Sequence, residues 1–66
     1  MTRYFYFVSF AKMHGEKLDI GNAEVEYEGL VTRWDDVVRL EAIVESMFRT
    51  NDVKILTYQL LRTEEG

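Results

Sequence analysis

The 66-residue chain contains no cysteine, only one histidine and no apolar run long enough to span a membrane. Without cysteine it can form neither a disulfide framework nor a cysteine-ligated zinc site, which are the usual supports of very small folds. A chain of this length buries only about 60% of the surface that its unfolded form exposes. We therefore expect a single domain over residues 1–66 that is stabilised by apolar packing and by association with another subunit.

Residue patterns that support catalysis are also scarce. The only histidine, His14, lies in a polar segment with Glu16 and Asp19, and their spacing matches no metal motif. Ser9 falls in a predicted strand instead of the sharp turn that exposes a hydrolase serine. The four glycines do not have the spacing of a phosphate-binding loop. These patterns predict no enzyme activity, no metal and no cofactor.

Positive charge is in short supply, with twelve acidic against eight basic residues and a net charge of −4. Residues 16–45 hold nine acids and three bases, a net of −6, so the two ends together carry +2. The chain therefore lacks the basic stripe that binds nucleic acid or anionic membranes. The first residues lead directly into an aromatic segment without a signal peptide, which predicts a cytoplasmic protein.

Aromatic residues are abundant: one tryptophan, four tyrosines and four phenylalanines. Residues 3–13 are so rich in aromatic and β-branched side chains that they predict a strand. Alternation gives this strand two apolar faces, one with Tyr4, Tyr6, Val8 and Phe10 and the other with Phe5, Phe7, Ser9, Ala11 and Met13. A strand that is apolar on both faces is expected at the centre of a sheet.

Residues 14–17 have the composition of a hairpin loop, and residues 18–28 alternate as a half-exposed second strand. Apolar residues at three- and four-residue intervals then predict a helix over residues 33–49, with Thr32 as its N-cap and Asp35 at the third helical position. Asn51 is expected to end the helix in a left-handed conformation. Residues 52–62 predict a third strand, and residues 63–66 a frayed polar tail.

These elements predict an α+β fold of the ββαβ type, with a three-stranded antiparallel sheet in the order 2-1-3 and one helix on one face. One helix leaves the second face open, and the alternation of the third strand places apolar residues on both of its faces. Exposed apolar patches of this kind usually mark an interface. We therefore expect a homo-oligomer, a dimer in its simplest form, with five predicted interface residues: Tyr4, Tyr6, Phe10, Leu56 and Tyr58.

Glu24, Glu26 and Glu28 share one face of the predicted second strand, where their carboxylates repeat every ~6.7 Å. This acidic ridge, together with Asp35 and Asp36 on the helix, is our predicted surface for a partner with a positively charged groove. The alternative is a solvated strand face whose charges prevent edge-to-edge aggregation.

The opening Tyr4-Phe5-Tyr6-Phe7-Val8-Ser9-Phe10, the segment at residues 21–26, the helix and the closing Val53-Lys54-Ile55-Leu56 are similar to a layout that recurs among small accessory proteins of phages and prophages. The resemblance covers nearly the whole chain, and no functional residue is carried over with it. It implies a role in the contest between phage and host, because anti-CRISPR proteins and other inhibitors of bacterial immunity are often small, acidic, oligomeric and free of catalytic motifs. One such family is instead thought to act on plasmid DNA.

The leading hypothesis is thus a phage-type protein that inhibits a host nuclease or another nucleic-acid-binding complex by protein–protein binding. The first alternative is a nucleic-acid-binding oligomer that stacks bases on Tyr4, Tyr6 and Phe10 and uses the cations near the strand ends. The second is a structural subunit of a larger particle. A small-molecule ligand held between subunits also stays open.

Overall fold

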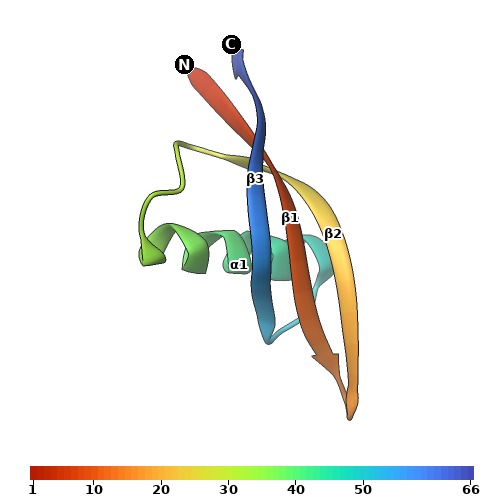
Figure 1. The fold of residues 1–66 in the computed structure, drawn as a ribbon. Helices are drawn as coiled ribbons and strands as arrows, with labels where there is room; N and C mark the ends of the chain where they lie inside the picture. The colour runs from red at the N-terminus through yellow and green to blue at the C-terminus, as the bar shows by residue number, and fades with distance from the viewer.

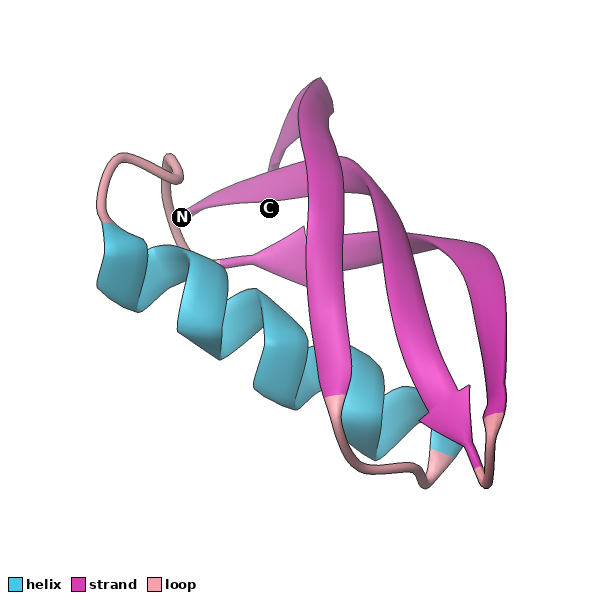
Figure 2. Ribbon diagram, turned by 60° about the horizontal axis from the view of Figure 1, so that its bottom comes forward, coloured by secondary structure: helices cyan, strands magenta, loops and turns pink.

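The computed structural model describes residues 1–66 and contains three strands and one helix, in the order predicted (Figure 1). The elements are β1 (Thr2–His14), β2 (Lys17–Tyr27), α1 (Trp34–Phe48) and β3 (Val53–Glu65). The strands form one antiparallel sheet in the order β2-β1-β3, and α1 lies against one of its faces (Figure 2). The structure therefore confirms the predicted α+β fold and the central position of the aromatic first strand.

The hairpin between β1 and β2 is tighter than the sequence indicated. His14 pairs with Lys17, which leaves only Gly15 and Glu16 in the turn. Gly15 has a φ of 66°, whereas Glu16 has no positive φ. A positive φ at the first central residue alone is typical of a type II′ turn, which matches the right-handed twist of the flanking strands. The turn therefore depends on the glycine at position 15.

The pairing of β3 with β1 contains two irregularities, one between Phe5 and Tyr6 and one between Ser9 and Phe10. At these points Leu61 and Leu56 are the extra residues of β3. Each bulge inserts one residue and so reverses the alternation of the strand. The predicted division of β3 into two apolar faces is therefore wrong, because the residues that pair opposite the helix-facing residues of β1 are Val53, Ile55, Tyr58 and Leu60.

The last residues of the chain also differ from the prediction. β3 continues to Glu65, which pairs with Thr2, and the backbone N–H of Gly66 donates to the carbonyl oxygen of Met1 at 2.9 Å. The predicted frayed tail at residues 63–66 is therefore wrong. These backbone groups are ordered because β1 begins at Thr2 and offers them a partner strand.

The hydrophobic core lies between the sheet and the helix. Its buried side chains are Tyr6, Val8, Phe10, Val25, Tyr27, Leu40, Val44 and Val53. Tyr6 and Phe10 are only 3% and 2% exposed, and Tyr4 packs partly buried against the same cluster. The prediction that Tyr6 and Phe10 form an oligomer interface is therefore wrong for the folded chain, because α1 covers their face of the sheet and leaves the other face open.

α1 is one residue shorter at each end than predicted, and its capping residues differ from the predicted ones. The N-cap is Arg33, and the carboxylate of Asp36, at the third helical position, accepts the backbone N–H groups of Thr32 and Arg33, both at 3.1 Å. The left-handed residue at the C-terminus is Arg49, with a φ of 53°. The predicted roles of Thr32, Asp35 and Asn51 as capping residues are therefore wrong.

Candidate protein-interaction surfaces

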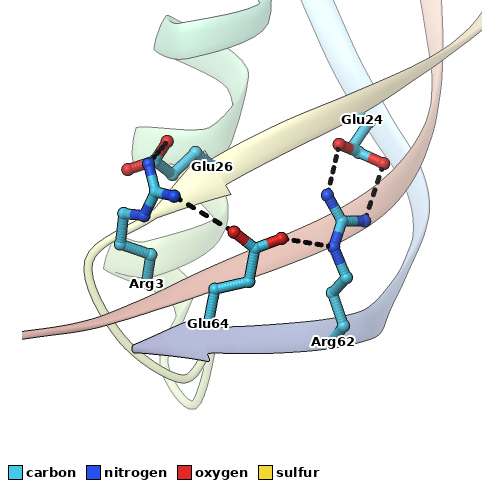
Figure 3. A network of polar contacts seen from close by, with 5 residues as sticks. All are labelled: Arg3, Glu24, Glu26, Arg62 and Glu64. Atoms are coloured by element: carbon cyan, nitrogen blue, oxygen red, sulfur yellow. Dashed lines mark hydrogen bonds and ion pairs between the residues drawn. The ribbon is translucent and has the colours of Figure 1, made fainter. Parts of the chain in front are cut away.

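A network of ion pairs covers one end of the open sheet face (Figure 3). Arg62 binds Glu24 through two contacts of 3.1 Å and Glu64 through its Nε at 2.9 Å. Arg3 contacts Glu64 at 3.1 Å and Glu26 at 3.7 Å. Because the two arginines come from the outer ends of β1 and β3, the network links all three strands across the face opposite the helix.

Both arginines also lie over the ring of Phe5. The guanidinium carbons of Arg62 and Arg3 are 4.3 Å and 5.5 Å from the ring centroid, within the range of cation–π contacts. Phe5 is only 9% exposed although no helix covers it. The chain therefore shields part of its second apolar face with its own charged side chains, since the stems of long cationic side chains cover apolar surface.

The network reduces the negative charge of the predicted acidic ridge. Hydrogen bonds from Arg62 hold the pKa of Glu24 and of Glu64 below the usual glutamate value, and the same bonds raise the pKa of Arg62. The five charges of Figure 3 are three carboxylates and two guanidiniums, a net of −1. Glu28 contacts Arg39 at 3.5 Å. All three ridge glutamates are thus paired within the chain.

The two aspartates of the predicted partner surface have different surroundings. Asp36 accepts hydrogen bonds from the hydroxyl of Tyr27 at 2.6 Å and from two backbone N–H groups, and these bonds lower its pKa, the tyrosine bond most strongly. Burial, followed by the bond to Asp36, raises the pKa of Tyr27. Asp35 is exposed and makes no side-chain hydrogen bond. Only Asp35 of this pair is free to contact a partner.

The other end of the open face is apolar and exposed. Met13 pairs with Leu18 and Ala11 with Ile20, so their side chains adjoin on the face opposite the helix. Leu18 and Ile20 are 62% and 60% exposed. We call the exposed apolar residues of this face, which also include Phe7, the hairpin patch: Phe7, Met13, Leu18 and Ile20.

A second apolar surface runs along the outer edge of β3, where the sheet has no further strand. Its side chains come from β3 and from the N-terminal half of α1, which projects past β3 in Figures 1 and 2. We call it the β3-edge surface: Trp34, Val38, Leu56, Tyr58, Leu60 and Leu61. Of the predicted interface residues, Leu56 and Tyr58 lie here and are exposed.

The molecule has one shallow depression, of about 430 Å³, lined by Glu26, Tyr27, Glu28, Arg39, Ala42 and Ile43. Its charged residues are engaged in the ion pairs described above. The hydroxyl of Ser9 donates to the amide oxygen of Asn22 at 2.8 Å and has no base beside it. No three acidic or histidine side chains come together as a metal site. The one helix, α1, is too short and too polar to cross a membrane.

Comparison with protein-family models, with curated proteins and with solved structures gave no significant match. The fold and its exposed chemistry define a small α+β protein with two apolar surfaces. The sequence pattern also contained a signal for the hairpin patch. Leu18 and Ile20 are separated from Glu24 and Glu26 by even numbers of residues along the strand, so alternation places all four side chains on the face opposite the core.

Proposed function

We propose that this protein acts by binding another protein and catalyses no reaction, as an inhibitor of the kind that phages direct against host defence or nucleic-acid-binding complexes. The observation that carries the proposal is the hairpin patch. Four apolar side chains lie exposed on one face of the two-stranded hairpin, and exposed apolar surface of this kind is the usual feature of a protein-binding site. Met13, Leu18 and Ile20 adjoin at the turn, and the Ser9–Asn22 pair separates them from Phe7. Hairpins present such side chains in a fixed arrangement, which lowers the entropic cost of binding.

The net negative charge of the molecule favours a partner with a basic surface. The chain carries twelve acidic and eight basic residues, a net charge of −4. Glu16 lies exposed in the hairpin turn next to the patch, and Lys54 lies opposite Ala11 on the same face of the sheet. Complementary charge around an apolar centre speeds association and selects the partner. A nucleic-acid-binding protein has a basic surface by necessity, so it fits a partner molecule of net negative charge.

Direct binding of nucleic acid is less well supported by the same geometry. Two of the three aromatic residues expected to stack on bases, Tyr6 and Phe10, are buried under α1. Four cations near the strand ends were expected to bind phosphates: Arg3, Lys12, Lys54 and Arg62. The two arginines are engaged with glutamates. Base-stacking proteins instead combine exposed rings with a cationic channel.

The test is affinity capture from bacterial lysate with the tagged protein, followed by reconstitution of the complex from purified components. The variant Leu18→Lys/Ile20→Lys places two charges in the hairpin patch, and we expect it to lower the affinity for the captured protein by on the order of 100-fold. The captured protein's own activity, measured with and without the inhibitor, then reports inhibition.

The matched control is Leu30→Lys, because Leu30 is 55% exposed but lies in the loop before α1. It is expected to bind like the unmodified protein. Equal binding by the Leu18→Lys/Ile20→Lys variant would remove the hairpin patch from the mechanism. Binding to DNA that weakens steeply with added salt would favour the nucleic-acid alternative instead.

A further inference from the structure

The two edges of the sheet are protected to different degrees. An exposed edge strand offers unpaired N–H and C=O groups to other strands, and proteins usually block it with charges or cover it. The edge strand β2 carries Lys17, Asp19, Glu24 and Glu26. The first part of the other edge strand is blocked by the helix, since the backbone N–H groups of Val53 and Ile55 donate to Glu45 and Glu41 at 3.1 Å and 3.0 Å. Residues 56–61 of β3 have neither protection and include no charged residue.

The direction of the free backbone groups follows from the pairing of β3 with β1. Because Val53 and Ile55 donate to helix glutamates, their N–H groups point away from β1. Hydrogen-bonded and non-hydrogen-bonded pairs alternate along an antiparallel ladder. Ile55 pairs with Phe10. Two and four residues before Phe10 on β1, Val8 pairs with Tyr58 and Tyr6 pairs with Leu60, so these pairs are of the same type. The backbone groups of Tyr58 and Leu60 therefore face outward.

The helix extends this edge with apolar side chains. Positions three and four residues apart lie on one face of a helix, so Trp34 and Val38 continue the row formed by Glu41 and Glu45. Trp34 is 73% exposed although it is the largest side chain of the molecule. A strand placed against the outer edge of β3 would lie beside this row and cover it.

We propose that the β3-edge surface is the dimer interface of this protein, and that its occupant is the same segment of a second copy. Two β3 strands would pair antiparallel about a twofold axis at Gln59, which joins the two sheets into one of six strands. Tyr58 of each copy then lies opposite Leu60 of the other, and their outward backbone groups bond to one another. A twofold contact needs one self-complementary surface, and an antiparallel strand pair has this property.

The available area agrees with this occupant. At areas typical of these side chains, the exposed parts of the β3-edge surface amount to roughly 600 Å² per copy, or about 1,200 Å² for two copies, which is the lower bound of specific stable interfaces. The backbone and polar atoms of the paired strands add to this area. The two bulges at Leu56 and Leu61 bound the regular segment and limit the pairing to the residues between them.

The proposal does not depend on the hairpin patch, and its test uses the mass of the full chain in solution. Size-exclusion chromatography with light scattering is expected to give twice the monomer mass at micromolar concentration. Leu60→Lys is expected to elute as a monomer, with a dimer dissociation constant raised about 100-fold, because the charge enters the interface twice. Ile20→Lys, on the hairpin patch, is the matched control and is expected to remain dimeric.

A second pair of variants separates a lost interface from a lost fold. Gln59 is exposed, so Gln59→Lys and Gln59→Glu leave the core intact. Each places like charges opposite one another across the axis and weakens its own dimer, whereas a mixture of the two forms the heterodimer. The proposal is overturned if the unmodified protein is a monomer, if the dimer survives Leu60→Lys, or if only Ile20→Lys abolishes the dimer. It is also overturned if the mixture of the two Gln59 variants associates no more tightly than either variant alone.

Discussion

At the scale of single residues, the open face of the sheet shows how much depends on partners that are distant in sequence. Arg62 and Glu24 are 38 positions apart, yet they form a bidentate pair that lies beside Phe5. The alternation of the sequence correctly predicted that Glu24 and Glu26 lie exposed on one face of a strand. It contained no signal for the arginine, because a long side chain near a strand end has many partners in reach. The charge of a surface is therefore less predictable than its position.

Gly21 gives the clearest prediction at this scale. A methyl group at this position would meet Cζ of Phe10 at 2.7 Å and its Cε2 at 3.0 Å. Phe10 is buried and its ring also packs against Phe48, with 5.4 Å between the centroids, so it has little room to move. We expect Gly21→Ala to destabilise the protein by about 1–3 kcal/mol, as overpacking of a core does. Urea unfolding measures the change.

The matched substitution is Gly29→Ala. No atom lies within 4 Å of a methyl group there, and Gly29 has no positive φ. Its unfolding free energy is expected to stay within about 0.5 kcal/mol of the unmodified value. If the two alanine variants were equally stable, the ring of Phe10 would not be held against position 21.

At the scale of elements, the positions of the helix and the strands could be predicted from local sequence patterns. The features that depend on tertiary contacts could not. The three strands, the helix and the sheet order were all predicted from alternation and from three- and four-residue spacing. The bulges at Leu56 and Leu61 were not, because a bulge depends on the partner strand and leaves no local mark here. The omission made the predicted faces of β3 wrong, whereas Tyr6 and Phe10 were wrong as interface residues because α1 covers their face of the sheet.

The start of α1 is a further case in which a tertiary contact decides between neighbours. Asp35 and Asp36 are equivalent by sequence, but the hydroxyl of Tyr27 donates to Asp36 and fixes it as the residue that accepts the N–H groups of Thr32 and Arg33. Sequence patterns at helix ends include no such contact from a strand. The helix start is therefore tied to the end of β2.

This tie predicts a pH dependence. The folded protein holds the pKa of Asp36 below the usual aspartate value, chiefly through Tyr27. A lowered pKa stabilises the fold above the unfolded pKa of about 4 and loses that stabilisation as the pH falls through the folded pKa. Asp36→Asn should therefore unfold at a lower temperature than the unmodified protein at neutral pH, and the gap should narrow as the pH falls below the unfolded pKa of about 4 and through the lower folded pKa.

Thermal unfolding followed by circular dichroism across this range measures the gap. Asp35→Asn removes the same charge one position earlier without removing a hydrogen bond, and its melting temperature should stay close to that of the unmodified protein throughout. A gap for Asp36→Asn that is constant with pH would show that its carboxylate does not stabilise the helix start through its charge.

At the scale of the whole molecule, the elongated chain, with extents of 42 × 19 × 17 Å, has its two apolar surfaces on different sides. The β3-edge surface lies at one edge of the sheet, while the hairpin patch is formed by β1 and the opposite edge strand, β2. A twofold axis at β3 leaves both hairpin patches facing outward at the far ends of a six-stranded sheet. The dimer would thus have two partner sites, and a target with repeated subunits would be bound more tightly than by one site.

Association also makes stability depend on protein concentration, because mass action stabilises a folded dimer over its unfolded chains. For a chain of this size we expect the melting temperature to rise by about 3–5 °C for each tenfold increase in concentration. Leu60→Lys should melt at a temperature that does not change with concentration, whereas Ile20→Lys should retain the dependence. Differential scanning calorimetry of the three proteins at several concentrations measures how much of the stability comes from self-association. A melting temperature of the unmodified protein that is independent of concentration would mean that a single chain is stable without a second copy.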